Sequence, residues 1–521
     1  MTAGSGGMVF GAEDLRQMQE LGIAPEEAER QLALFRDPPA PVRLDRPATV
    51  GDGILRLDEG AQRRLGSEAE EARAEGGFVE FVPASGAASR MFRDLEAALE
   101  GGAGSAADEL LDRLPDLAFY EDLRDALAAA GDDLEARRRR GDARPVLEHL
   151  LTTAGGHGLA YAQRPKGLIP FHRYPGERRT AFEEHLVEAT ALLSDGTGLC
   201  RLHFTVSPEH REGFQAILAA VGERYAARYG SRFEVAWSFQ DHATDTLAVD
   251  LENRPFRTDD GRLLFRPGGH GSLLANLEAA GGDVVFVKNI DNVVQDGRRP
   301  PVLAWRRALA GLLLEVRERA FDLAAAVEER GDDPALLAEA ARFLAERLHR
   351  PLPAGAAAAP HEERRRSVLA GLDRPLRACG VVANAGEPGG GPFWVESDGQ
   401  LSLQIVEKSQ VAAEDAGQQA ILAAATHFNP VDLVCSLTDR RGRPYRLADL
   451  VDPATVFIAE KSHQGRRLKA LERPGLWNGA MAGWNTVFLE VPLATFAPVK
   501  TVFDLLRPEH QTGVPPLPGA P

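Results

Sequence analysis

Short apolar segments alternate with helical ones through the middle of the chain, and this alternation most constrains the fold. The strand-like segments are residues 78–82, 201–206, 233–238, 246–250 and 284–288. The helical segments between or after them are residues 181–193, 208–229 and 271–279. Strands that alternate with helices are typical of α/β domains with a mainly parallel sheet. We therefore predict a mixed, mostly parallel sheet flanked by helices.

Helical patterns also predict how the rest of the chain is organised. Residues 12–36 read as two helices, the second beginning at Pro25, a residue favoured in the first helical turn. The predicted units are an N-terminal helical cap (1–75), a core (76–300) with a helical insertion (95–151), a helical insertion and linker (301–372), the remaining core (373–505) and a disordered tail (506–521). The run Arg137–Arg140 in the first insertion favours a solvated helix face over a nucleic-acid patch.

Composition excludes several classes of protein. The chain has 521 residues and a formal charge of -17, so it is not expected to bind nucleic acid or a membrane surface generally. No apolar run is long enough to span a bilayer, and the first residues lack the features of a signal peptide. Three scattered cysteines fit a reducing compartment. We expect a cytoplasmic protein and leave its oligomeric state open.

Lysine is rare in this chain. Only six of the 60 basic residues are lysine, and they are Lys166, Lys288, Lys408, Lys461, Lys469 and Lys500. Lysine and arginine serve equally on most solvated surfaces, whereas a crowded site can require the compact ammonium group. Each lysine is therefore a candidate functional residue, with an ordinary surface position or ion pair as the alternative.

The stretch "FVPASGAASRMF" (81–92) joins a predicted strand to a predicted helix through small residues. Small side chains let backbone N–H groups approach an anion at the positive N-terminus of a helix. The stretch therefore predicts either a phosphate-binding loop or an ordinary strand-to-helix turn.

Taken with "RPKGLIPFH" (164–172), the stretch "ASGAASRM" resembles the split nucleotide signature of sugar-phosphate nucleotidyltransferases. Further segments resemble motifs of the UDP-sugar pyrophosphorylases in the same order: "FTVSP", "WSFQ", "FRPGGHGSLL", "VFVKNIDNV", "LQIVEKSQ", "HFNP" and "FAPVK". Ser85, Ala88 and Ser89 depart from the glycines and threonine usual in that family. We also expect the full chain to belong to a bacterial family known only as a domain of unknown function.

This resemblance implies a nucleotidyltransferase-like fold and a reaction between a nucleoside triphosphate, UTP by the resemblance, and a sugar 1-phosphate. The products are a nucleotide sugar and pyrophosphate. By the resemblance, Arg90, Lys166 and Lys500 are the catalytic cations that hold phosphate groups. Asp291 is the expected ligand of Mg²⁺, since this hard cation prefers carboxylate oxygen and bridges to phosphates.

The resemblance also implies which residues hold the nucleotide and the sugar. The expected nucleotide-binding residues are Ser85, Gly86, Ala87, Gln240, Gly269 and His270. The expected sugar-binding residues are Gly380, Glu407 and Asn429. His270 replaces the usual asparagine, and a second "GGHG" at residues 155–158 leaves its role open. The stretch "GEPGGGPFW" (386–394) is either a substrate lid with Trp394 stacking on the sugar or a hairpin loop.

Two other functions remain open on the sequence. A glycosyltransferase normally has a D-x-D metal motif, and only "NIDN" stands near Asp291. A non-catalytic nucleotide-sugar sensor is consistent with the altered glycines. For any nucleotide site in such a fold, residues 78–82 and 284–288 should form neighbouring strands, with the loop at 85–90 and Asp291 at their carboxyl ends.

Overall fold

A computed structural model describes residues 10–101, 104–331, 333–353, 355–356, 359–386, 389–397, 399–428 and 432–513. No helix in these ranges is long and apolar enough to cross a membrane. The three cysteines lie within them, and all three are buried free thiols.

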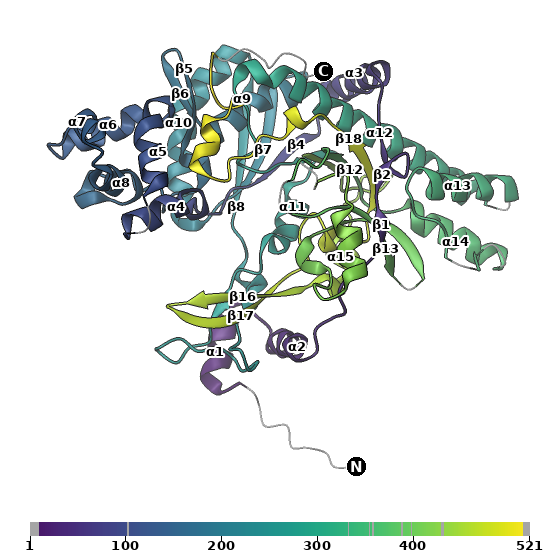
Figure 1. Ribbon diagram of the computed structural model, residues 1–521. Helices are drawn as coiled ribbons and strands as arrows, with labels where there is room; N and C mark the ends of the chain where they lie inside the picture. The colour runs from purple at the N-terminus through teal and green to yellow at the C-terminus, as the bar shows by residue number, and fades with distance from the viewer. Residues whose placement is uncertain are drawn as a thin grey trace.

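A nine-stranded sheet forms the centre of the molecule (Figure 1). From edge to edge its strands are β2 (Thr49–Val50), β3 (Gly53–Leu55), β18 (Asn485–Glu490), β12 (Leu376–Val381), β15 (Asp432–Ser436), β11 (Val284–Val287), β4 (Phe78–Pro83), β7 (Leu199–Thr205) and β8 (Arg232–Ser238). Strand β15 is antiparallel to both neighbours, and every other neighbouring pair is parallel. The predicted mixed, mostly parallel sheet is confirmed, as is the pairing of β4 with β11.

Alternating side chains let the sheet bury both faces, because successive residues of a strand point to opposite sides. In β11, Val284 and Phe286 belong to one core, whereas Val285 and Val287 belong to another. The first core is completed by helices α3 (Glu59–Glu75), α9 (Ala181–Leu192), α10 (Arg211–Tyr229) and α12 (Arg299–Arg330). The second is completed by α11 (Leu274–Ala280) and the hairpin of β13 (Gly391–Ser397) and β14 (Gln400–Val406).

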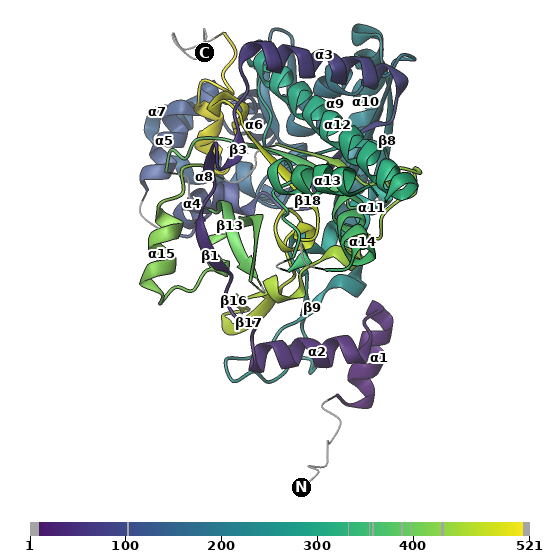
Figure 2. The same ribbon diagram turned by 90° about the vertical axis from the view of Figure 1, so that its right-hand side faces the viewer.

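Two groups of helices lie at opposite ends of the sheet (Figures 1 and 2). At one end are α4 (Ser89–Leu99), α5 (Ser105–Arg113), α6 (Tyr120–Ala129), α7 (Leu134–Arg140) and α8 (Ala143–Leu151). They share a separate apolar core with the C-terminal residues Val499, Val502 and Leu505. At the other end are α13 (Pro334–Glu346) and α14 (His361–Leu372). The C-terminal segment is thereby fastened to the helices that follow β4.

The N-terminal segment is more than helical. Helices α1 (Ala12–Leu21) and α2 (Pro25–Arg36) pack with Leu247 and Leu471, but β1 (Arg43–Pro47) pairs with β13, and β2 and β3 join the central sheet. The sheet also contains strands from before and after the helices at 299–372. The domain boundaries drawn from the sequence remain a prediction, and linker residues 354, 357 and 358 lie outside the described ranges.

Three expectations need correction. The strand predicted at 246–250 shortens to β9 (Thr246–Leu247), which pairs with β10 (Phe265–Arg266) outside the central sheet. Trp394 is a buried residue of β13 with Arg46 over its ring, so the expected stacking of Trp394 on a sugar is wrong, and residues 391–394 form a strand after the loop at 386–390. Residues 387–388 of that loop lie outside the described ranges.

The predicted tail is partly ordered structure. His510 is 2% exposed, and its Nδ1 lies 2.9 Å from Nε2 of His172. This buried contact places residues up to 513 on the folded molecule, so the expectation of disorder is wrong for 506–513. Residues 514–521 lie outside the described ranges.

Helix α9 is unusual because its charged side chains are buried. Glu184 is 1% exposed and accepts hydrogen bonds from Tyr174 and Arg299, and one of its oxygens lies 2.8 Å from Nδ1 of His172. Burial raises the pKa of Glu184, but His172, Arg299 and Arg179 outweigh it and lower the pKa to about 2. The free energy of unfolding therefore includes a contribution from ionised Glu184.

We expect this contribution to be complete above the ordinary pKa of the carboxyl group, about 4.5, and to be lost as the pH falls toward about 2. The measurement is urea unfolding at several pH values between 7 and 3. Glu184→Gln should be less stable at pH 7 and should lose less stability on acidification than the parent. Equal acid sensitivity of the two proteins would contradict the assignment.

Candidate functional site

The loop between β4 and α4 lies at the carboxyl edge of the sheet, where two backbone hydrogen bonds fix its ends. Ala84 N–H donates to Thr205 O of β7 at 2.8 Å, and Ala88 N–H donates to Arg164 O at 2.8 Å. The first contact ties the loop to the neighbouring strand. The second brings it beside the segment that carries Lys166.

Three consecutive backbone donors in the middle of this loop make no hydrogen bond to the described residues. Within the described part of the chain, no hydrogen bond engages the N–H groups of Ser85, Gly86 and Ala87. Helix α4, which begins at Ser89, has no side-chain N-cap. Free N–H groups at the positive end of a helix are suited to an anion such as phosphate. The alternative of an ordinary strand-to-helix turn would not require these donors to stay free.

Lys166, Asp291 and Lys500 meet beside this loop and are called here the lysine–aspartate cluster. Lys166 Nζ lies 2.7 Å from Asp291 Oδ2 and 2.5 Å from Val499 O. Lys500 Nζ lies 3.4 Å from the same carboxylate oxygen. The Asp291 side chain is 8% exposed, that of Lys166 is 14% exposed and that of Lys500 is 63% exposed. The two cations thus converge from segments 334 positions apart (500 minus 166).

The electrostatics of this cluster keep Asp291 ionised. Burial alone would raise its pKa, but Lys166 and Lys500 outweigh that effect and hold the pKa below its usual range. One carboxylate charge faces two ammonium charges, so the cluster carries a net positive charge in a protein of formal charge -17. Such a local positive site can bind an anion that the whole molecule would repel.

Local structure explains why these side chains are fixed. Gly167 follows Lys166, and an added Cβ there would lie 2.5 Å from the ring of Phe214, so only glycine lets this turn pack against α10. Val499 N–H donates to Asp291 O, and Asp504 accepts from the N–H groups of Lys500 and Thr501. The hydrogen bond from Val499 to Asp291 therefore holds the C-terminal segment against the residues that follow β11.

Arg90 lies in the first turn of α4 and is exposed. Among the described residues, no hydrogen bond or ion pair joins it to the lysine–aspartate cluster. Its side chain makes no hydrogen bond or ion pair with the described residues, so its role as a phosphate ligand stays a prediction.

A second group of predicted residues meets around His270. His270 Nδ1 accepts from Leu476 N–H at 2.8 Å, and the imidazole stacks on Trp477 with ring centres 5.3 Å apart. Its Nε2 lies 3.7 Å from Glu407 Oε1, which also accepts from Asn478 Nδ2 at 3.3 Å. A predicted nucleotide-binding residue and a predicted sugar-binding residue are therefore neighbours.

Gln240 lies near this second group. Its Nε2 donates to Asp245 Oδ1 at 3.0 Å, and the adjacent Thr244 carbonyl accepts from Arg473 Nε at 2.7 Å. Arg473 N–H in turn donates to Gly268 O, next to Gly269. The side chain of Gln240 is thus committed to Asp245 through its amide nitrogen and retains its oxygen as an acceptor.

Two predicted sugar-binding residues are not placed in either group. At Gly380 in β12, an added Cβ would lie 3.0 Å from Leu309 and 3.3 Å from Val491. This glycine lets α12 pack closely on the sheet. The space beside Gly380 that was expected to admit a sugar is therefore occupied by Leu309 of α12. Asn429 lies outside the described ranges.

Gly269 has a backbone conformation that other residues rarely adopt, with φ 79° and ψ -171°. An added Cβ would also lie 2.4 Å from Glu472 Oε2. We expect Gly269→Ala to lower the free energy of unfolding by about 1–3 kcal/mol, as measured by urea unfolding. Gly86→Ala is the control, because an added Cβ there has no atom within 4 Å and should leave stability nearly unchanged. Equal losses would contradict this account.

Trp477 and Asn478 were not among the residues predicted from the sequence. They lie in "GLWNG", which belongs to none of the motifs that carried the resemblance. Three arginines donate to backbone carbonyls within residues 477–484: Arg377 to Trp477, Arg374 to Gly483 and Arg350 to Trp484. Only the folded structure brings these donors to the segment.

At a magnesium site, protein carboxylates could supply only some of the oxygen ligands, and a bound substrate and water would have to supply the others. The described residues contain no group of three or more histidine, cysteine, aspartate or glutamate side chains placed to hold a metal ion. Mg²⁺ commonly uses one or two carboxylates together with substrate phosphates and water. Asp291 fits that pattern, since both lysines contact Oδ2 and leave Oδ1.

The family described as "Domain of unknown function (DUF4301)" matches residues 11–511. No curated protein matches the sequence significantly. Among solved structures, the chain is similar to the uridine diphosphate N-acetylglucosamine pyrophosphorylase of Trypanosoma brucei, with 12% identity, a TM-score of 0.47, and 95% of this chain and 79% of that chain covered. It is similar to a UDP-glucose pyrophosphorylase mutant of Leishmania major, with 12% identity, a TM-score of 0.45, and 95% and 77% covered.

Proposed function

We propose that this chain, which belongs to the DUF4301 family, is a sugar-phosphate nucleotidyltransferase. It would join a nucleoside triphosphate, with UTP as the expected substrate, to a sugar 1-phosphate and release pyrophosphate. The observation that carries the proposal is the lysine–aspartate cluster beside the free N–H groups of residues 85–87.

The proposed reaction is attack by a sugar-phosphate oxygen on the α-phosphorus of the triphosphate, with pyrophosphate as the leaving group. Its barrier is raised by crowding of negative charge, so positioned cations and backbone donors supply most of the catalysis. The 85–87 N–H groups would bind the triphosphate, and Lys166, partly buried beside them, would place one positive charge against it. The exposed Lys500 would reach the sugar phosphate.

Magnesium is part of the proposal. When bound, Mg²⁺ would supply positive charge shared among phosphate oxygens. Asp291 would hold it through Oδ1, while Oδ2 keeps its contacts with the lysines. The altered loop residues Ser85, Ala88 and Ser89 do not remove this option, because the donors that matter are backbone N–H groups.

The group around His270 would hold the nucleoside and the sugar. The imidazole of His270 on Trp477 offers a flat surface with one ring nitrogen facing Glu407. Glu407 would accept hydrogen bonds from sugar hydroxyls, and the oxygen of Gln240 would accept one from a base N–H. Trp477 and Asn478 join this proposed site as additional residues.

The test is pyrophosphate release by the purified chain with Mg²⁺, a panel of nucleoside triphosphates and a panel of sugar 1-phosphates. Release that needs both substrates supports the proposal. Sugar transfer from a nucleotide sugar to an acceptor would instead identify a glycosyltransferase. Tight nucleotide-sugar binding without turnover in any combination would identify a non-catalytic sensor.

Asp291→Asn is expected to lower the rate of pyrophosphate release by about a hundredfold or more, because it removes the carboxylate that orders Lys166 and Lys500 and holds Mg²⁺. The rate of the variant should also lose the steep dependence on Mg²⁺ concentration that the parent shows. Asp250→Asn is the control, since Asp250 pairs with Arg254 away from the cluster. Unchanged rate and unchanged Mg²⁺ dependence in Asp291→Asn would remove this residue from the site.

A further inference from the structure

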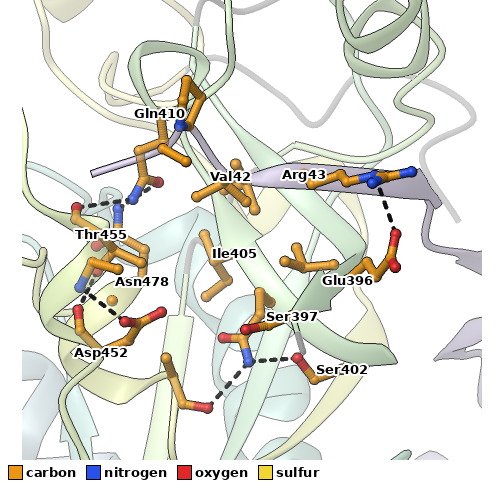
Figure 3. A pocket seen from close by; sticks show the side chains of 18 residues that line it. Val42, Arg43, Glu396, Ser397, Ser402, Ile405, Gln410, Asp452, Thr455 and Asn478 are labelled. Carbon is orange, nitrogen blue, oxygen red and sulfur yellow. Dashed lines mark hydrogen bonds and ion pairs between the residues drawn. The ribbon is translucent and has the colours of Figure 1, made fainter. Parts of the chain in front are cut away.

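A cavity of about 290 Å³ lies away from the lysine–aspartate cluster, beside the β13–β14 hairpin (Figure 3). Its walls come from residues 40–43, from the hairpin, and from residues 452–455 and 478–482. Asp452, Thr455 and Asn478 lie on one side in Figure 3, and Arg43 with Glu396 lies on the opposite side. Ligand pockets usually measure about 300–1,000 Å³, so this cavity, just below that range, has room only for a small ligand.

The polar groups on the walls include two hydrogen-bond acceptors that lack a donor among the described residues. Gln404 Nε2 donates to Ser402 Oγ and to Ala482 O, both at 3.1 Å, which turns the amide so that its oxygen is left over. Within the described residues nothing donates to that oxygen. Asp452 accepts from Ala454 N–H through one carboxylate oxygen and keeps the other. These acceptor oxygens could bind the O–H or N–H groups of a ligand.

The charges of the lining exclude an anionic ligand. Its one cationic side chain, Arg43, already faces Glu396 at 3.1 Å and is 73% exposed. The carboxylate of Asp452 adds a negative charge without a cation beside it in the lining. A phosphate group in this cavity would be repelled and would find no free guanidinium or ammonium partner.

Apolar groups line the rest of the cavity. Val42, Val395 and Ile405 contribute hydrocarbon surface between the polar groups. A wall that combines hydrocarbon with oxygen acceptors and the hydroxyls of Ser397 and Ser402 matches a molecule with C–H faces and O–H edges.

We propose that this cavity binds an uncharged polyhydroxylated small molecule, of the class of free sugars and polyols. The cavity adjoins the proposed substrate site and shares Asn478 with it, whereas Glu407 contacts the lining residues Asn478 and Gln410 but does not itself line the cavity. The inference does not depend on the proposed nucleotidyl transfer, and binding can be measured without turnover.

The experiment is isothermal titration of the full chain with glucose, myo-inositol and sorbitol, beside glucose 1-phosphate and putrescine as anionic and cationic comparisons. We expect at least one of the three neutral probes to bind. Ser402→Leu fills the cavity from the middle of β14 and should weaken that binding at least about tenfold. Ser402→Ala removes one hydroxyl and should weaken it by roughly two- to tenfold, as for a single hydrogen bond.

Each other result would overturn the proposal. Binding of none of the neutral probes, or neutral-probe binding that Ser402→Leu leaves unchanged, would show that the cavity is not their site. Binding of glucose 1-phosphate or putrescine that is tighter than that of glucose and is lost in Ser402→Leu would show that the ligand class is wrong. Circular dichroism and the unfolding temperature of Ser402→Leu would verify that the variant is folded.

Discussion

Replacing Lys166 by alanine is expected to slow pyrophosphate release by at least about a hundredfold, the effect of misplacing reacting groups by about an ångström. Lys166 is the better buried of the two ammonium groups at Asp291, and its Nζ is held by two oxygens at 2.7 and 2.5 Å. Its removal takes away both the charge and one of the contacts that join Asp291 to the C-terminal segment. The fold should survive, because Lys500 still faces the carboxylate.

Lys166→Arg tests whether activity needs only the positive charge at this position or also the compact shape of the ammonium group. The guanidinium group keeps the charge but is broad and planar, whereas the space between Asp291 Oδ2 and Val499 O holds a compact ammonium. We expect activity in the order parent, arginine variant, alanine variant, measured as initial rates at saturating substrates. Lys461→Arg is the matched control, because Lys461 forms a comparable 2.8 Å ion pair with Glu472 elsewhere. Full turnover by Lys166→Arg, with unchanged affinity for the triphosphate, would exclude Lys166 as a phosphate ligand.

The parts of the fold that the sequence could predict are those with strong local patterns. Strands β4, β7, β8 and β11 are apolar or alternating runs beside clear helices, and they form consecutive neighbours in the sheet. The other half of the sheet was not predicted in detail. Strands β2 and β3 have two and three residues, too few for a periodic signal, and the antiparallel placement of β15 depends on contacts between distant segments.

The residues of the candidate site could likewise be predicted only in part from the sequence. The scarcity of lysine made all six lysines candidates, and the resemblance selected Lys166 and Lys500, which do meet at Asp291. The same argument favoured a functional role for Lys288, three positions before Asp291, but the structure buries it in an ion pair with Glu188 of α9. A count of lysines identifies unusual positions, but it does not predict that the partner of Lys288 lies on a helix 100 residues away. Trp477 and Asn478 were missed because their neighbours come from three other segments.

The ion pair of Lys288 belongs to a buried network whose disruption should have the largest effect on stability. Arg306 of α12 contacts Glu188 and also donates to Asp432 of β15 at 2.9 Å. Lys288, Glu188, Arg306 and Asp432 are each at most 3% exposed. Burial lowers the pKa of Arg306, but Asp432 and Glu188 outweigh it and raise the pKa, so the guanidinium stays charged.

We expect Arg306→Met to lower the free energy of unfolding by about 3–5 kcal/mol in urea titrations, because removing one member of a buried ionic network leaves an uncompensated charge. Arg64→Met is the control, since Arg64 also bridges two carboxylates but is 52% exposed, and its loss should cost at most about 1 kcal/mol. Similar losses for the two variants would show that burial does not decide the effect.

A second substitution tests whether the loss of stability in Arg306→Met comes from the unpaired carboxylate of Asp432 or from lost packing. Asp432 loses its hydrogen-bonded partner in Arg306→Met, whereas Glu188 keeps Lys288. If the stranded carboxylate causes the loss, adding Asp432→Asn to Arg306→Met should restore part of the stability, because the amide carries no charge. If the loss came from the missing packing of the arginine side chain, the double variant would be no more stable than the single one. Recovery in the double variant is the result expected from a network in which α9, α12 and the two strands are joined by charge.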